Sequence, residues 1–134
     1  MTLKMEDKKI LSDIRMGKAY EFLEDARVNH KEGRYKTSIN RSYYAALNAI
    51  RSILILEGAN PETHEGVITM FSLRFIKPAL LPINIIKNFK ILLSRRTDVD
   101  YGDFETIDLA ESEDSLKITK EIIEAVDIMR RKLI

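Results

Sequence analysis

Arginine, tyrosine and asparagine side chains recur at helical spacing in the segment from Ile39 to Gly58. On a helix with about 100° per residue, they share roughly a third of the circumference. This polar face consists of Asn40, Arg41, Tyr44, Asn48 and Arg51. Arginine offers a rigid fork of donors suited to phosphate or carboxylate, and tyrosine offers a stacking plane with a polar tip. The pattern predicts either an anion-binding surface or a polar network that locks this helix to its neighbours.

The rest of the same helix is apolar or small. Its broad apolar stripe predicts the side that faces the core: Ile39, Tyr43, Ala46, Leu47, Ile50, Ile53 and Leu54. A strip of small residues would let another helix backbone approach closely: Ser38, Ser42, Ala45 and Ala49.

Composition predicts one helix-rich domain spanning residues 1–134. The chain is 45% apolar and 32% charged, with only three prolines and five glycines. A net charge of +1 excludes a generally basic nucleic-acid surface, so an anion site must be a local arginine cluster. The absence of cysteine excludes disulfides and thiolate metal sites.

Apolar periodicity predicts an all-α, up-and-down bundle of about five helices, four long and one shorter. The expected helices run from Leu3 or Asp7 to Lys31, from Tyr35 to Gly58, from Pro61 to Pro78, from Pro82 or Asn84 to Arg96, and from Asp108 to Leu133. Gly33 and Gly58 are predicted to end helices, and Asp108 with Glu111 resembles a capping box.

Four local features carry further expectations. Asn60 is predicted to cap the third helix, and Gly17 to mark a close helix contact. The stretch from Thr97 to Asp108 is predicted to be a polar loop, pinned by Tyr101 and Phe104. Three cations at the end of the last helix suit the helix dipole: Arg130, Arg131 and Lys132.

Several functional classes are not expected. No apolar run is long enough to span a bilayer and the N-terminus does not resemble a signal peptide, which predicts a cytoplasmic protein. Glycine-rich phosphate loops, GxSxG and HExxH are all absent, so no cofactor is predicted. His64 has no second histidine or cysteine at ligand spacing, so no metal is predicted either.

Two motifs in combination resemble the HEPN domain (higher eukaryotes and prokaryotes nucleotide-binding), in its small stand-alone prokaryotic members. They are Asn40-Arg41-Ser42-Tyr43-Tyr44-Ala45 and Arg96-x-x-x-Asp100-Tyr101, with Thr63-His64-x-Gly66-Val67 between them. The resemblance implies a helical bundle, usually a homodimer with a cleft where two copies meet. Many members are ribonucleases with an Arg-x(4–6)-His motif, often paired with a small nucleotidyltransferase in toxin–antitoxin systems. In some pairs the partner adenylylates a tyrosine near that motif; by position, Arg96 matches the motif arginine and Tyr101 the aromatic residue.

The chain departs from the nuclease pattern because no histidine follows Arg96, and Asn48 stands where related sequences often carry one. Cleavage of RNA by its 2′-OH needs a group that accepts a proton near neutral pH and a cation for the developing charge. Arg96, Arg95 and Arg41 are candidates for the cation. The remaining proton acceptors are Tyr101, Asp98 and Asp100, whose ordinary pKa values near 10 and 4 suit the task poorly.

Three hypotheses follow. In the first, a dimeric module works with a nucleotidyltransferase and binds nucleotide or RNA phosphate through Arg41, Tyr44, Asn40, Asn48, Arg51 and Arg95 beside Arg96 and Tyr101, with Tyr101 as the candidate for modification. In the second, the chain is a metal-independent ribonuclease toxin in which Arg96 stabilises charge and Tyr101 or Asp100 positions the 2′-OH. In the third, it is a non-catalytic dimeric scaffold in which Arg96 pairs with Asp98 or Asp100.

Overall fold

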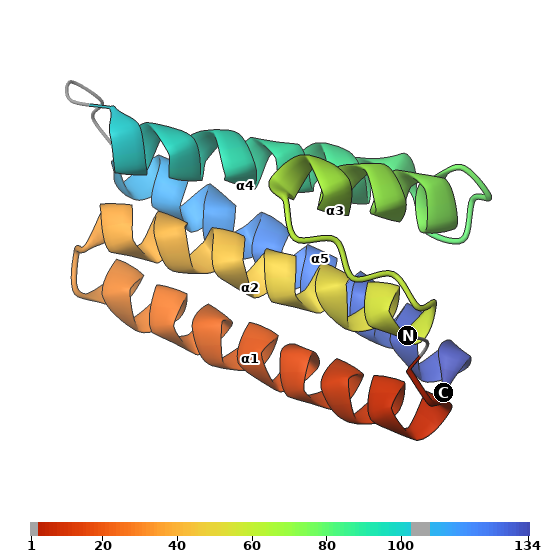
Figure 1. Ribbon diagram of the computed structural model, residues 1–134. Coiled ribbons are helices and arrows are strands. Elements are labelled where there is room, and N and C mark those ends of the chain that lie inside the picture. Colours follow the sequence, from red (N-terminus) through yellow and green to blue (C-terminus); the bar gives the residue numbers. More distant parts are fainter. Residues whose placement is uncertain (1–2, 103–107) are drawn as a thin grey trace.

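The computed structural model describes residues 3–102 and 108–134, and every regular element in those ranges is a helix (Figure 1). The elements are α1 (Met5–Lys31), α2 (Tyr35–Leu56), α3 (His64–Phe71), the π-helical turn η1 (Ser72–Ile76), α4 (Ile83–Tyr101) and α5 (Leu109–Leu133). The four long helices run alternately up and down, with the short α3 in the connection between α2 and α4 (Figure 1). The predicted all-α bundle of four long helices and one shorter helix is confirmed.

Helix α2 is the central element and packs against α1, α4 and α5 (Figure 1). Its predicted apolar stripe is buried apart from the half-buried Leu47, and all four residues of its small-residue strip are buried. Ser38 shows why small size matters here, because its hydroxyl donates to the Ala26 carbonyl of α1 at 2.7 Å. The polar face remains half-buried, so packing holds these side chains without removing them fully from solvent.

Three predicted helix boundaries are confirmed. Gly33 and Gly58 adopt φ values of +80° and +79° directly after α1 and α2, in the left-handed region where glycine is least strained. At the start of α5, the Asp108 carboxylate accepts a hydrogen bond from the Glu111 backbone N–H at 3.0 Å.

The predicted start of the third helix is wrong. Helix α3 begins at His64 and is capped by Thr63, whose hydroxyl accepts from the Gly66 N–H at 2.9 Å. Asn60 cannot serve as the cap because its side-chain oxygen already accepts hydrogen bonds from Arg15 and Arg51. Arg15 and Arg51 thus occupy the side-chain oxygen that the local sequence pattern assigns to the cap of the helix.

The predicted end of the fourth helix is also wrong, because α4 continues past Arg96 to Tyr101. The Thr97 hydroxyl donates to the Leu93 carbonyl at 2.9 Å, and Arg96 pairs with Asp100 one turn later. Residues 97–101 are therefore helical, while the predicted anchoring by Phe104 lies outside the described residues. Gly17 makes no close helix contact, since a Cβ added there would meet no atom within 4 Å.

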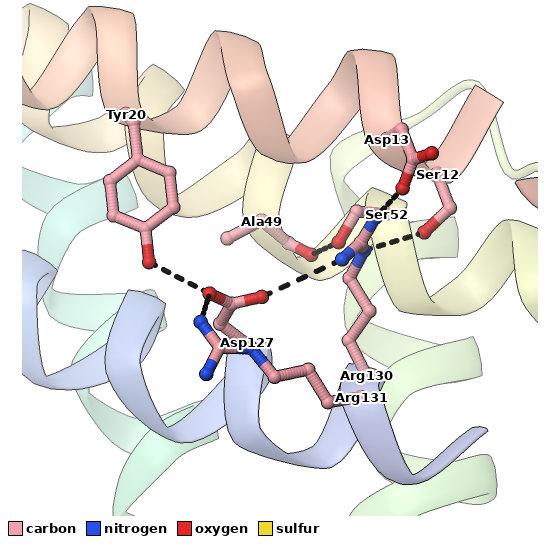
Figure 2. A network of polar contacts seen from close by, with 8 residues as sticks. All are labelled: Ser12, Asp13, Tyr20, Ala49, Ser52, Asp127, Arg130 and Arg131. Atoms are coloured by element: carbon pink, nitrogen blue, oxygen red, sulfur yellow. Dashed lines mark hydrogen bonds and ion pairs between the residues drawn. The ribbon is translucent and has the colours of Figure 1, made fainter. Parts of the chain in front are cut away.

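A polar network joins the C-terminal part of α5 to α1 (Figure 2). Asp127 accepts from Tyr20 at 2.9 Å and from Arg131 at 3.0 Å. Arg130 donates through Nε to Ser12 at 2.9 Å, contacts the Asp13 carboxylate closely, and lies 3.7 Å from Asp127. Arg130 therefore makes specific tertiary contacts with α1, beyond the dipole role that the sequence predicts, whereas Arg131 pairs within its own helix.

Among the described residues, no helix combines the length and the apolar character that crossing a membrane would require.

Candidate functional site

Arg96 lies at the centre of a cluster formed between α4 and α2. Its side chain is only 14% exposed and donates through Nη2 to the Tyr44 hydroxyl at 3.0 Å. Its Cζ lies 5.5, 5.7 and 6.0 Å from the ring centres of Tyr44, Tyr43 and Tyr101. Three tyrosine rings around one guanidinium provide cation–π attraction and fix its position.

One carboxylate accompanies this guanidinium. Asp100 Oδ2 lies 2.8 Å from Arg96 Nε, and the two groups form an ion pair. Burial lowers the pKa of Arg96, and the charges of Tyr44, Asp100 and Tyr101 outweigh it, so that the net shift is upward. Arg96 is thus a cation that Asp100, Tyr44 and the surrounding tyrosine rings hold in place.

A chain of polar contacts links Arg41 of α2 to Arg96 of α4. Arg41 donates to the Asn40 side-chain oxygen at 3.3 Å, and Asn40 donates to Asp100 Oδ1 at 3.3 Å. The Arg41 guanidinium lies 5.7 Å from the ring centre of Phe22 in α1, and no carboxylate pairs with it in the part of the chain that the structure describes. The two predicted arginines therefore lie on one side of the molecule, joined by Asn40 and Asp100.

Tyr101 is the accessible member of the cluster. It is the last residue of α4, and it is 74% exposed although its ring lies against Arg96. The helical extension of α4 holds Arg96, Asp100 and Tyr101 in a fixed relation. Most of the surface of Tyr101 is therefore accessible to solvent.

Tyr43 and His64 also belong to this cluster, although the residue pattern predicts neither as a site residue. Tyr43 is fully buried, stacks on Phe89 with ring centres 5.4 Å apart, and forms a hydrogen bond between its hydroxyl and His64 Nδ1. Burial raises the pKa of the Tyr43 phenol well above its usual value. The paired tyrosines at positions 43 and 44 were the available signal, because adjacent residues on a helix point in different directions and can hold opposite sides of one group.

Three predicted residues do not join the cluster. Arg95 faces α5, where it contacts Ser115 and Asp114, each at 2.9 Å. Asn48 donates to the Tyr44 backbone carbonyl of its own helix at 2.9 Å, and Arg51 bonds to Asn60. The structure thus brings together six of the predicted residues: Asn40, Arg41, Tyr44, Arg96, Asp100 and Tyr101.

The chemistry of this cluster suits anions and aromatic bases. Within the described ranges, no three His, Asp or Glu side chains come together in a way that would hold a metal ion. A hollow of about 430 Å³ lies elsewhere, between α1 and α5, and is lined by residues outside the cluster: Tyr20, Leu23, Glu24, Arg27, Leu116, Lys117 and Lys120. A partly desolvated guanidinium beside exposed aromatic surface is an arrangement that binds phosphate groups and stacked bases.

Comparison with known proteins identifies the family. The family model described as the HEPN domain matches residues 13–129, which is most of the chain. The chain belongs to the HEPN domain family.

Individual relatives agree with this assignment. A UPF0332 protein of Thermotoga maritima is 24% identical over 123 residues, which cover 92% of this chain and 93% of that protein. A candidate toxin of Methanocaldococcus jannaschii is 34% identical over 58 residues, which are 43% of each chain. The crystal structure of an archaeal HEPN homologue superposes with a TM-score of 0.72 at 17% identity, covering 89% of this chain and 97% of the other.

Proposed function

We propose that this chain binds a phosphate group of a nucleotide or RNA beside Arg96 and Tyr101. We also propose that it works with a small nucleotidyltransferase in a toxin–antitoxin-like pair. One observation carries the proposal: Tyr101, 74% exposed, has its ring centre 6.0 Å from the Cζ of an almost buried arginine. A hydroxyl that an enzyme can reach thus lies next to a cation that would hold the phosphate attached to it.

The donors near Arg96 support phosphate binding. Arg96 is a largely buried cation, and Arg41 lies nearby without a carboxylate partner in the described part of the chain. Asp100 opposes binding, because its carboxylate already lies 2.8 Å from the guanidinium and repels an incoming anion. We therefore expect Asp100→Asn to bind a nucleotide phosphate more tightly than the unaltered protein.

Modification of Tyr101 would have a direct electrostatic effect. In adenylylation, the Tyr101 oxygen forms a bond to the α-phosphorus of ATP, the bond to the β-phosphate oxygen breaks, and pyrophosphate leaves while the phenolic proton goes to solvent. The product places a negatively charged phosphodiester beside Arg96. That phosphodiester would pair with the guanidinium in place of an RNA phosphate and so block the site.

Binding is tested by fluorescence anisotropy with a labelled oligouridylate and with ATP as competitor. Arg96→Gln should weaken binding about tenfold or more, because it removes a charge-assisted contact. Arg95→Gln is the matched control, since it removes the same charge one residue away from a side chain that faces α5. Equal losses in the two variants would mean that net charge, and not this cluster, governs binding.

Modification is tested by purifying the chain with its nucleotidyltransferase from the native host and mapping modified peptides by mass spectrometry. The adenylyl group should be found on Tyr101 and be absent from Tyr101→Phe, while Tyr20→Phe, at a half-exposed tyrosine, should remain modified. A homodimer with a shared cleft is part of the proposal. Sedimentation that shows only monomer at micromolar concentration would remove that cleft.

A second candidate function is the metal-independent ribonuclease with Arg96 as the key residue. The observation in its favour is that His64 forms a hydrogen bond with Tyr43, whose ring contacts Arg96. His64 supplies an imidazole, a side chain that can accept and donate a proton and that is absent after Arg96 in the sequence.

Cleavage of a fluorogenic RNA in EDTA tests this second function. We expect His64→Gln and Arg96→Gln each to abolish cleavage, whereas Arg95→Gln should retain it. If none of the variants changes any activity or binding and no tyrosine is modified, the cluster is the internal network of a scaffold.

A further inference from the structure

Two arginines from different helices converge on one neutral acceptor at the other end of the polar face. Arg15 of α1 and Arg51 of α2 donate through Nη2 to the same side-chain oxygen of Asn60, at 2.9 and 3.2 Å. Arg15 also reaches the Arg51 backbone carbonyl at 3.4 Å. Asn60 is exposed and lies in the connection between α2 and α3, so the arrangement is open to solvent on that side.

The charge of this arrangement is not balanced. No ion pair among the described residues involves Arg15 or Arg51, and Glu57 and Glu62 of the same connection form none there. Burial lowers the pKa of Arg15, and the nearby charge of Arg51 lowers it further. A third cation lies nearby, because the Lys8 ammonium is 3.6 Å from the position of a Cβ built on Gly58.

The hydrogen-bonding capacity is also not used up. An amide oxygen has two lone pairs, and the two arginines fill both at Asn60. Arg51 Nε is buried and has no hydrogen-bond partner in the part of the chain that the structure describes. Two forks of donors that meet at an exposed acceptor, with no carboxylate paired to either arginine, form an arrangement that an oxyanion would complete.

We propose that Arg15, Arg51 and Asn60 form a second anion site that binds a phosphate group, separate from the Arg96 cluster. Arg51 follows Tyr44, which contacts Arg96, by two helical turns, or about 10 Å along α2. The site does not depend on the function proposed above, because no residue is shared. A phosphate placed here accepts from both guanidiniums, neutralises their repulsion and gives Arg51 a negative partner.

The probe is inorganic phosphate, titrated into the unaltered protein at constant ionic strength with NaCl as the reference. We expect the melting temperature to rise with phosphate more than with chloride, and the Arg51 Nε–H resonance to shift saturably. In the Arg96→Gln variant, which removes the phosphate contact proposed above, the Arg51 Nε–H resonance should still shift saturably. A labelled oligouridylate and AMP, tested in the same way, distinguish an RNA backbone from a free nucleotide as the source of the phosphate.

Arg15→Gln and Arg51→Gln should each weaken phosphate binding about tenfold or more, whereas Arg34→Gln removes an exposed arginine elsewhere and should not. A variant that fails to fold leaves the resonance titration of the unaltered protein as the deciding measurement. The proposal is overturned if phosphate and chloride act alike and the Arg51 resonance does not move. In that case the two arginines only fasten the α2–α3 connection.

Discussion

Arg130 contacts two carboxylates that differ in burial. We expect the more distant but buried carboxylate to contribute more to stability than the closer but exposed one. The contact with Asp13 is the closer one, yet the Asp13 side chain is 67% exposed. Asp127 lies 3.7 Å away, but its side chain is only 9% exposed and also accepts from Tyr20 and Arg131. Figure 2 shows both carboxylates around the same guanidinium.

Asp13→Asn should lower the free energy of unfolding by no more than about 1 kcal/mol, because solvent screens an exposed pair. Asp127→Asn should lower it by about 3 kcal/mol, since it leaves the nearly buried Arg130 without its buried partner. With about 2.1 cal/mol/K of unfolding entropy per residue, the second change corresponds to roughly 10 °C in Tm for a chain of this size.

The measurement is urea denaturation followed by far-UV circular dichroism, at one protein concentration because a dimer would make stability depend on it. Both substitutions keep the side-chain size and one acceptor oxygen, so each is the control for the other. If Asp13→Asn proves as destabilising as Asp127→Asn, the distance of a pair matters more here than its burial, and our reasoning about this network is wrong.

Three further changes have expected outcomes. The pKa of Tyr43 is raised in the folded protein, so its protonated phenol contributes stability that is lost above about pH 10, at up to about 1.4 kcal/mol per pH unit. Tyr43→Phe also removes the hydrogen bond to His64, and it should flatten this loss of stability in denaturation curves recorded at pH 9 to 11. Gly17→Ala should raise the free energy of unfolding by about 1 kcal/mol, since the helix gains propensity and no atom obstructs the methyl group. Gly66→Ala should lower it by about 1 kcal/mol, because the new Cβ would lie 2.9 Å from the Thr63 oxygen that caps α3; a helix signal and melting temperature equal to those of the unaltered protein would contradict this.

The sequence predicts the core of this fold well because periodicity reports which side of a helix is buried. All four residues of the small strip of α2 are buried, and so are most residues of its apolar stripe. Helix ends that depend on backbone conformation, such as Gly33 and Gly58, are equally visible in the sequence. Both features are local, so a single chain segment contains the information.

The errors arise where a distant side chain decides the local structure. Asn60 reads as a helix cap until Arg15 and Arg51 take its oxygen. The stretch after Arg96 reads as a loop because it is acidic and precedes a glycine, yet the contacts of Arg96 with Asp100 and with Tyr44 of α2 accompany a continued helix.

The candidate site was predictable in part. Arg96 follows Phe89 and Leu92 by seven and four positions, which places it in the middle of the buried side of α4, whereas Arg95 lies at the edge of that side. That spacing separates the two arginines without a structure. The role of His64 was not predictable in this way, because its contact with Tyr43 depends on how α3 folds back onto α2.

The network in Figure 2 joins positions that are more than a hundred residues apart, Tyr20 with Asp127 and Ser12 with Arg130. A ribosome that has released α1 through α4 has therefore not yet supplied the groups that satisfy Ser12 and Tyr20. Until the final turns of α5 are available, the side of α1 that packs against α5 lacks its hydrogen-bond partners. We expect a released chain truncated before Asp127 to be cleaved by protease within α1, and one that extends past Arg131 to resist.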